Sequence, residues 1–236
     1  MGLPDAYVVR ARVAPVIVVG IPILALFISN LLTGTELKNL AVIGIVGITA
    51  ITLIAQLGRD LGKKIEQALY EEWNGKPTTV MLRHSNDRID SITKARLHNR
   101  LSEKVPNLHL PNSDEENSNP QQADIIYDSA VLWLRSNTQD NSKFLRLHEE
   151  NISYGFRRNL LGLKLLGLFL AFGIVIVKIL VDRPFSLEKI SSFVLEPEII
   201  ASVFLIAFLS LIVTKNWVKY AAESYAFALF NAAESI

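Results

Sequence analysis

Three basic residues, Arg96, Arg100 and Lys104, recur at four-residue spacing near the middle of the chain. Residues four apart lie on one side of an α-helix, so a helix here presents a row of positive charges. Such a row suits phosphate groups, because charge-assisted hydrogen bonds from basic side chains to phosphate oxygens are strong. We therefore expect an anionic nucleotide or oligonucleotide ligand. The candidate ligand-binding residues are Arg83, His84, Arg96, Arg100, Lys104, Arg157 and Arg158.

The same charges have a second explanation that involves no specific ligand. Basic residues at this spacing are common on the solvent-exposed face of a helix. Positive charge close to a membrane is also attracted to anionic lipid headgroups. The whole chain carries a formal net charge of only +1, so it has no global basic field for non-specific nucleic-acid binding. Any site for a polyanion must be local.

A second polar pattern lies inside an apolar stretch, where Thr49, Thr52 and Gln56 fall on one side of a helix. These residues are our candidate pore-lining residues. Hydrogen bonding between helices is the alternative, because threonine side chains commonly bond to their own backbone or to a neighbouring helix. Since the apolar stretches lack an obvious acidic or basic relay, we expect any conduction to occur along the axis of a symmetric oligomer.

Signatures of enzymes are scarce, and we expect no catalytic residue, metal site or cofactor. Residues 74–79, NGKPTT, resemble a phosphate-binding loop only superficially, because Pro77 replaces the hydroxyl residue that binds magnesium. The four histidines show no pairing at i, i+4. The chain contains no cysteine, which excludes disulfides, thiolate zinc sites and a cysteine nucleophile. A membrane-bound hydrolase would need a nucleophile and a base that the sequence does not show.

The composition indicates a membrane protein. Of the 236 residues, 50% are hydrophobic, and the mean hydropathy is +0.30. The apolar residues gather in four runs that approach the length needed to cross a bilayer. The fold class predicted is an all-α membrane protein with four transmembrane helices and a helical cytoplasmic domain between the second and the third. The spans are expected at residues 13–32, 40–57, 160–181 and 199–213.

Short connections and flanking charges predict the topology. The connection at residues 33–39 is short enough for the first two spans to form an antiparallel hairpin. Lys164 and Lys178 bracket the third span, and we expect each ammonium group to reach an opposite membrane interface. Basic residues are more frequent before the first and third spans and after the second and fourth. Both termini and the central domain are therefore expected on the cytoplasmic side of the membrane.

The central domain, residues 58–159, is predicted to be helical. An apolar stripe from Leu61 to Trp73 should continue the second span into the cytoplasm, and further helices are expected from Ser85 or Asn86, from Asp124 and from about Asp140. Residues 106–122, with three prolines and an acidic cluster, are expected to form a loop or a disordered insert. The remaining segments are an N-terminus at 1–12, a transmembrane hairpin at 13–57, a second transmembrane pair at 160–213 and a C-terminal cytoplasmic helix at 214–236.

Three segments resemble a group of bacterial inner-membrane proteins: residues 73–83 (WNGKPTTVMLR), 93–96 (TKAR) and 150–159 (ENISYGFRRN). The chain also resembles the transmembrane effectors of anti-phage systems that pair a nucleotidyltransferase with a membrane protein, of the Hailong type. The resemblance covers the central domain and the beginning of the third run. It implies an oligomeric ion channel, with a tetramer favoured, that binds a nucleotide-derived oligomer made by a nucleotidyltransferase partner.

Two functions follow as hypotheses. In the first, the protein is a homo-oligomeric effector in a lipid membrane, an ion channel gated by an anionic nucleotide or single-stranded oligonucleotide bound to the cytoplasmic domain, and it acts in anti-phage defence. The central domain is joined to membrane helices at both ends, so a ligand that changes its packing also moves the spans. In the second, the protein is a non-conducting scaffold or assembly factor that anchors a cytoplasmic partner.

Overall fold

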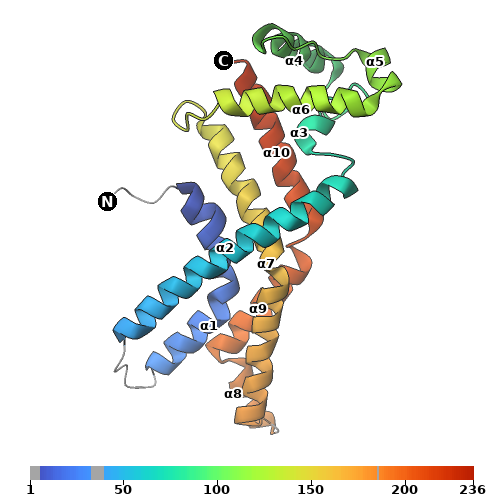
Figure 1. Ribbon diagram of the computed structural model, residues 1–236. Helices are drawn as coiled ribbons and strands as arrows, with labels where there is room; N and C mark the ends of the chain where they lie inside the picture. The colour runs from blue at the N-terminus through green and yellow to red at the C-terminus, as the bar shows by residue number, and fades with distance from the viewer. Residues whose placement is uncertain (1–5, 33–39, 185) are drawn as a thin grey trace. The chain divides into compact units, whose positions relative to one another are not determined.

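The computed structural model describes residues 6–32, 40–184 and 186–236, and within these ranges it describes the side chains of all residues except 30–32, 40–46, 187 and 188. No strand occurs in these ranges, which confirms the all-helical class (Figure 1). The elements are a π-helix, η1 (Val8–Val13), and the α-helices α1 (Ala14–Leu32), α2 (Leu40–Glu72), α3 (Pro77–Val80), α4 (Ser91–Lys104), α5 (Ser113–Ser118), α6 (Pro120–Asn137), α7 (Leu145–Asp182), α8 (Leu187–Val194), α9 (Pro197–Leu211) and α10 (Lys215–Ala233).

The chain forms two compact units that alternate along the sequence. Unit 1 comprises Met1–Glu66 and Gly155–Val218, and unit 2 comprises Gln67–Tyr154 and Lys219–Ile236. Three helices, α2, α7 and α10, contribute residues to both units. The second apolar run continues as an unbroken helix, as expected, because α2 runs without a break to Glu72.

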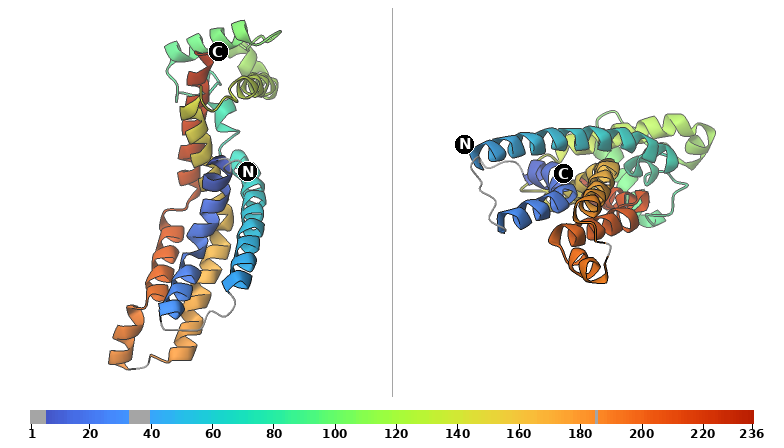
Figure 2. Two further views of the ribbon diagram at one scale, coloured as in Figure 1. Left: turned by 90° about the vertical axis from the view of Figure 1, so that its left-hand side faces the viewer. Right: turned by 90° about the horizontal axis from the view of Figure 1, so that it is seen from below.

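Unit 1 has a small apolar core and a large apolar surface. α1 packs along α9, as Figure 2 shows. Large apolar side chains are nevertheless left on the outside, among them Leu165 with 80% and Phe169 with 75% of its surface exposed. Water would make such a surface costly, whereas lipid tails would solvate it. The core residues are Val16, Val19, Ala55, Leu160, Leu163, Ala171, Leu205, Leu209 and Val213.

Two helical segments are long and apolar enough to cross a membrane, Val8–Ser29 and Leu145–Asp182. The fourth expected span, residues 199–213, largely coincides with α9, which ends at Leu211, and the chain bends by 66° before α10. This pair gives a third candidate only if the bent pair forms one span. The second expected span belongs to α2, but the side chains of residues 40–46 lie outside the described residues, as does the expected turn at residues 33–39. Four spans therefore remain a prediction.

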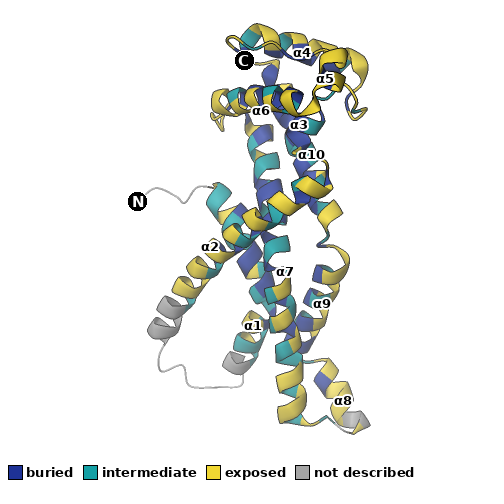
Figure 3. Ribbon diagram, turned by 45° about the vertical axis from the view of Figure 1, so that its right-hand side comes forward, coloured by how far each residue is buried: buried dark blue, intermediate teal, exposed yellow. Residues whose placement is uncertain are grey.

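Unit 2 is built around a core to which its last helix contributes. Leu97 and Leu101 from α4, Tyr127 from α6 and Leu229 from α10 are buried in one cluster. Figure 3 shows buried residues along α10 as well as α4 and α6. The C-terminal helix expected at 214–236 is therefore present and packs on the rest of unit 2.

Helix boundaries in unit 2 depart from the expected ones: α6 begins at Pro120 and α7 at Leu145, and side-chain caps account for two further differences. α4 begins at Ser91 rather than near Ser85, because the Asp90 side chain accepts a hydrogen bond from the Thr93 amide and caps the helix. The stretch expected as a loop at 106–122 contains α5, whose N-terminus carries a capping box formed by Asn112 and Glu115. Local capping bonds of this kind organise a polar segment that has little apolar periodicity.

Candidate functional site

Arg83 is held by a carboxylate from a neighbouring helix. Its Nε and Nη2 atoms donate to the two oxygens of Asp124 at 2.8 and 2.7 Å, a bidentate arrangement. This hydrogen bonding raises the pKa of the Arg83 guanidinium further above its ordinary value, against an opposing effect of burial. Gly75, with φ of +128°, lies against this guanidinium: a Cβ at residue 75 would lie 3.0 Å from Nη2. Arg83 therefore ties the segment after α3 to α6, next to the loop that precedes α3.

His84 belongs to a compact polar cluster around Glu116. The Glu116 carboxylate accepts hydrogen bonds from the amides of His84 and Ser85 at 2.7 and 3.1 Å and from the Tyr127 hydroxyl at 2.8 Å. Burial opposes ionisation of Glu116, but these hydrogen bonds outweigh it and lower the pKa of the carboxyl. Burial and the hydrogen bond to Glu116 raise the pKa of Tyr127, so the hydroxyl stays protonated and donates.

Two further buried polar residues complete this cluster. The His98 ring packs edge-on against His84, with 4.8 Å between ring centroids, and its Nε2 lies 2.8 Å from the Leu82 carbonyl oxygen. Burial lowers the pKa of His98 and also that of Lys94. The Lys94 ammonium donates to the carbonyl oxygens of Arg83, at 2.7 Å, and Asn86. The cluster therefore ties the segment between α3 and α4 to α5 and α6.

The predicted row on α4 is present, and its arginines already have internal partners. Arg96 Nε lies 3.1 Å from Glu234 Oε1, and both side chains are exposed. Arg100 contacts Glu103 at 3.3 Å and donates to the main-chain oxygen of Ile236 at 3.2 Å. Arg96 and Arg100 also line an open depression of about 380 Å³ together with Leu97 and Glu234. An anion binding here would displace or share these contacts. Lys104 lies in the last turn of α4 and is half-buried.

The other two predicted arginines lie in unit 1, where each has partners. Arg158 is 8% exposed and pairs with Glu66 at 2.8 Å. The Arg157 guanidinium lies 4.8 Å from the centroid of the Trp217 ring and donates to the Trp217 carbonyl oxygen at 3.0 Å. The structure therefore does not place Arg157 or Arg158 in one site with the residues of α4.

The candidate pore-lining residues share an exposed face of α2. Thr49, Thr52 and Gln56 are all exposed in the single chain, next to apolar residues such as Leu53, which is 65% exposed. The Thr52 hydroxyl donates to the carbonyl oxygen of Ile48 at 2.9 Å, which is a local bond that threonine commonly forms within a helix. This face is available to lipid, to another copy or to water.

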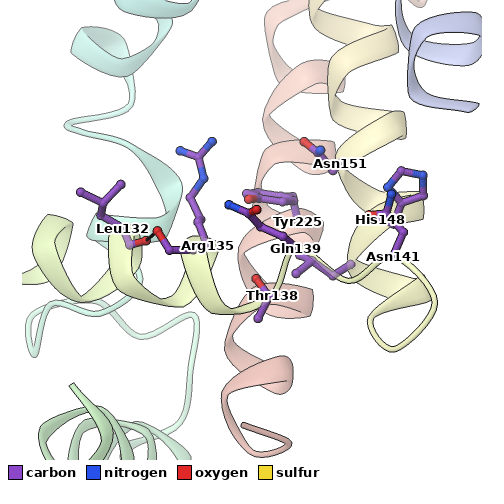
Figure 4. A pocket seen from close by; sticks show the side chains of 10 residues that line it. Leu132, Arg135, Thr138, Gln139, Asn141, His148, Asn151 and Tyr225 are labelled. Carbon is purple, nitrogen blue, oxygen red and sulfur yellow. Dashed lines mark hydrogen bonds between the residues drawn. The ribbon is translucent and has the colours of Figure 1, made fainter. Parts of the chain in front are cut away.

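A pocket between α6, α7 and α10 offers a binding geometry that the sequence did not indicate. It is a cavity of about 440 Å³ within unit 2, which is in the range typical of small-molecule sites. In Figure 4, Arg135 extends from α6 on one side, His148 and Asn141 lie on the other, and Gln139 and Tyr225 lie between them. We call it the α6–α7 pocket. Its lining residues are Leu132, Arg135, Ser136, Thr138, Gln139, Asn141, Leu147, His148, Asn151 and Tyr225.

The lining of the α6–α7 pocket combines one guanidinium with neutral polar groups. Arg135 is exposed in the last turn of α6, while His148 and Asn151 are half-buried on the first turns of α7. Tyr225 stacks on Tyr154 with 6.5 Å between ring centroids, which fixes the orientation of its ring. An anionic group can bind Arg135, and the amides supply both donors and acceptors for a polar ligand.

The sequence could not reveal this pocket because its residues come from three separate stretches. Arg135 and His148 stand on either side of a turn between two helices, and Tyr225 comes from the other end of the chain. The one available signal is the short polar connection between α6 and α7, because a short connection brings two helix ends together. Among the described residues, no group of histidine and acidic side chains is placed to hold a metal ion.

Comparisons of the chain with protein-family models, with curated proteins and with solved structures find no match.

Proposed function

We propose that this protein is a membrane effector in which a small anionic ligand, bound in the α6–α7 pocket, controls the arrangement of the membrane helices. One observation carries the proposal: α7 is a single helix from Leu145 to Asp182, and it supplies both pocket residues and a candidate membrane span. Leu147, His148 and Asn151 line the pocket within its first two turns. A ligand that shifts the start of a continuous helix also biases the rest of it.

The lining of the pocket favours a ligand about the size of one nucleotide. A volume of about 440 Å³ accommodates a small molecule but not a folded oligomer. Arg135 suits a phosphate group, and the half-buried side chains of Tyr225 and Asn151 suit a planar polar ring. An oligonucleotide would place one unit in the pocket and extend over the surface, where Arg96 and Arg100 lie in the second depression of unit 2.

The readout proposed is ion conduction by a homo-oligomer, with a tetramer favoured and both termini in the cytoplasm of a bacterial cell. The exposed polar face of α2 at Thr49, Thr52 and Gln56 supports this, because its side chains can form hydrogen bonds with water in a pore or with another copy of the chain. A nucleotidyltransferase partner would supply the ligand, and the biological setting would be anti-phage defence. Loss of protection in a plaque assay on changing Arg135 would test that setting.

Ligand binding is tested with the full-length protein in detergent, using ATP and a short single-stranded DNA oligonucleotide as probes. Arg135→Gln is expected to weaken binding about tenfold, the effect of losing one charge-assisted hydrogen bond. Arg146→Gln is the matched control, because Arg146 is an exposed residue of α7 that does not line the pocket. Affinity should fall as salt rises, since phosphate contacts are screened. Equal binding by both variants and the unchanged protein rejects the pocket.

Charge reversal of Arg96 and Arg100 tests the alternative location of the same ligand. If the row on α4 binds phosphate, Arg96→Glu with Arg100→Glu abolishes binding while Arg135→Gln does not. The opposite pattern places the ligand in the α6–α7 pocket. Membrane insertion should be unchanged in every variant, because none of these residues belongs to an apolar core.

Conduction is tested by ion flux into liposomes that contain the purified protein, with and without each probe. Flux that depends on the probe supports the channel. Absence of flux under every condition favours the second function, a non-conducting scaffold that anchors a cytoplasmic partner. The internal pairing of Arg83, Arg96 and Arg100 is the observation that favours the scaffold, because these residues already have intramolecular partners.

A further inference from the structure

Two uncharged stretches of unit 1 lie side by side between two polar contacts. Residues 165–177 of α7 carry no charge, and neither do residues 199–214 of α9 and the bend that follows it. At one end of these stretches, the Lys164 ammonium donates to the Val213 carbonyl oxygen at 2.9 Å. At the other end, the Lys178 ammonium lies 3.4 Å from Glu198 Oε1. The charged boundaries of the two stretches therefore coincide at both ends.

This arrangement supports the expectation that the two lysines mark opposite membrane interfaces. Lys164 and Lys178 are separated by about 21 Å along the axis of α7. Lysine side chains that extend outward bring this length closer to the hydrocarbon thickness of a bilayer, about 30 Å. The contact between Lys164 and Val213 therefore lies at the level where lipid tails give way to headgroups.

The Lys164 end of α7 has further features of a membrane interface. Trp217 lies in the first turn of α10, and its ring packs edge-on against Phe156 and Phe208. Tryptophan is enriched at the level of lipid headgroups. The Arg157 guanidinium lies 4.8 Å from the centroid of the Trp217 ring. On the opposite side of Lys164 along α7, the exposed apolar surface begins at once with Leu165, which is 80% exposed.

Arg157 and Lys164 retain donors for an anion. Both side chains are half-buried, and each donates to one main-chain oxygen near the bend, at 3.0 and 2.9 Å. A guanidinium has five N–H donors and an ammonium has three, so further donors are available. Neither side chain forms an ion pair with a carboxylate in the part of the chain that the structure describes, in contrast to Arg158, which pairs with Glu66.

We propose that Arg157, Lys164 and Trp217 form a binding site for the headgroup of an anionic phospholipid. The two cations are two turns apart on one face of α7, and the carbonyl groups that they contact are four residues apart, so both cations reach the same bend. Basic sites of this kind between membrane helices bind phosphate headgroups. The acyl chains would lie against the exposed apolar surface that begins at Leu165, which favours a lipid over a soluble phosphate. The site does not involve the α6–α7 pocket.

Native mass spectrometry of the full-length protein in detergent tests the site, with phosphatidylglycerol and phosphatidylcholine as probes. The unchanged protein should retain phosphatidylglycerol in preference to phosphatidylcholine. Arg157→Gln and Lys164→Gln should each weaken binding of phosphatidylglycerol about fivefold, the contribution of one basic residue near a lipid surface. Lys189→Gln, at an exposed lysine of α8, is the matched control and should leave binding unchanged.

Three results of this experiment would overturn the proposal. The first is equal retention of the two lipids by the unchanged protein, and the second is undiminished binding of phosphatidylglycerol by both glutamine variants. The third is displacement of the lipid by inorganic phosphate, which lacks acyl chains and would show that the site binds soluble phosphate instead.

Thermal melting in lipid nanodiscs separates lipid binding from a purely structural role of the same cations. A cation that contacts the carbonyl groups at the end of a helix also stabilises that end, so Lys164→Gln should lower the melting temperature in every lipid. The unchanged protein should melt at a higher temperature with phosphatidylglycerol than with phosphatidylcholine alone. Lys164→Gln should reduce this difference, whereas Lys164→Arg, which keeps the charge, should preserve it. An equal difference in the unchanged protein and in Lys164→Gln would leave only the structural role and contradict the proposal.

Discussion

Arg158 Nη1 lies 2.8 Å from Glu66 Oε1, so an ion pair joins α7 to α2 inside unit 1. Only 10% of the Arg158 side chain and 19% of the Glu66 side chain are exposed. Next to this pair, the Asn159 amide donates to the Ala11 carbonyl oxygen of η1 at 2.8 Å. Two neighbouring residues of α7 thus connect it to η1 and to the C-terminal part of α2.

Removal of Arg158 should strongly destabilise unit 1. Arg158→Met removes one member of the ion pair with the half-buried Glu66 carboxylate, and breaking a buried pair in this way typically costs about 3–5 kcal/mol. The expected result is a large fall in the melting temperature of the detergent-solubilised protein. The double variant Arg158→Met with Glu66→Met should lose less than the two single variants combined, because both single changes break the same ion pair. Lys189→Met, at an exposed lysine of unit 1, is the control; additive losses in the double variant would contradict the pairing.

The crossing of α2 and α7 depends on two glycines. A Cβ on Gly162 would lie 2.7 Å from the backbone nitrogen of Gly62, and a Cβ on Gly62 would lie 2.6 Å from Asn159 Oδ1. Gly162→Ala therefore forces the helices apart, and overpacking of this kind costs about 1–3 kcal/mol. Gly173→Ala is matched to it, because the same helix offers open space within 4 Å at residue 173. Alanine should be neutral or slightly stabilising there. A similar fall in melting temperature for both variants would contradict the close crossing.

Unit 2 should be sensitive to acid through Glu116. The pKa of Glu116 is lowered in the folded state, so its contribution to stability is present above the ordinary pKa of a glutamate, 4.5, and is lost as pH falls through the folded value. Glu116→Gln removes an acceptor from the amides of His84 and Ser85 and is expected to cost about 1–3 kcal/mol at neutral pH. The stability of this variant should also decrease less than that of the unchanged protein as the pH falls into the acid range.

The measurement for Glu116 is thermal melting followed by near-ultraviolet circular dichroism between pH 7 and acid. Asp140→Asn is the comparison, because Asp140 is an exposed carboxylate whose pKa is also lowered, chiefly by the Ser142 hydroxyl. An exposed group of this type contributes little to stability, so its removal should leave the acid limb unchanged. An equal effect of both variants would show that the Glu116 cluster is not the acid-sensitive element.

The exposed polar face of α2 distinguishes the two proposed functions. Replacement of Thr49, Thr52 and Gln56 together by leucine should abolish ion flux if this face lines a water-filled path, while the protein remains folded. The scaffold hypothesis predicts that the leucine variant still functions, because only helix packing would matter at this face of α2. Liposome flux and size-exclusion chromatography measure the two properties separately. Leu53→Ala, next to this face, is the control and should preserve flux.

Sequence periodicity was sufficient to predict the helical class and the helices that extend from unit 1 into unit 2. The apolar stripe from Leu61 to Trp73 predicted the extension of α2, and the helix expected from about Asp140 and the third apolar run together form α7. Boundaries in polar stretches were predicted less well, because side-chain caps at Asp90 and Asn112 determine them and caps have short, ambiguous sequence signatures.

The sequence by itself determined the apolar segments, the absence of cysteine chemistry and the basic row on one side of α4, because these depend only on residue type and spacing. Only the tertiary structure decided which charges meet. It paired Arg83 with Asp124, brought Arg135 and Tyr225 into one pocket and gathered carboxylates from two helices around Lys178. The physical reason is that such contacts join residues far apart in the chain, and helical periodicity carries no information about which faces of different helices come together.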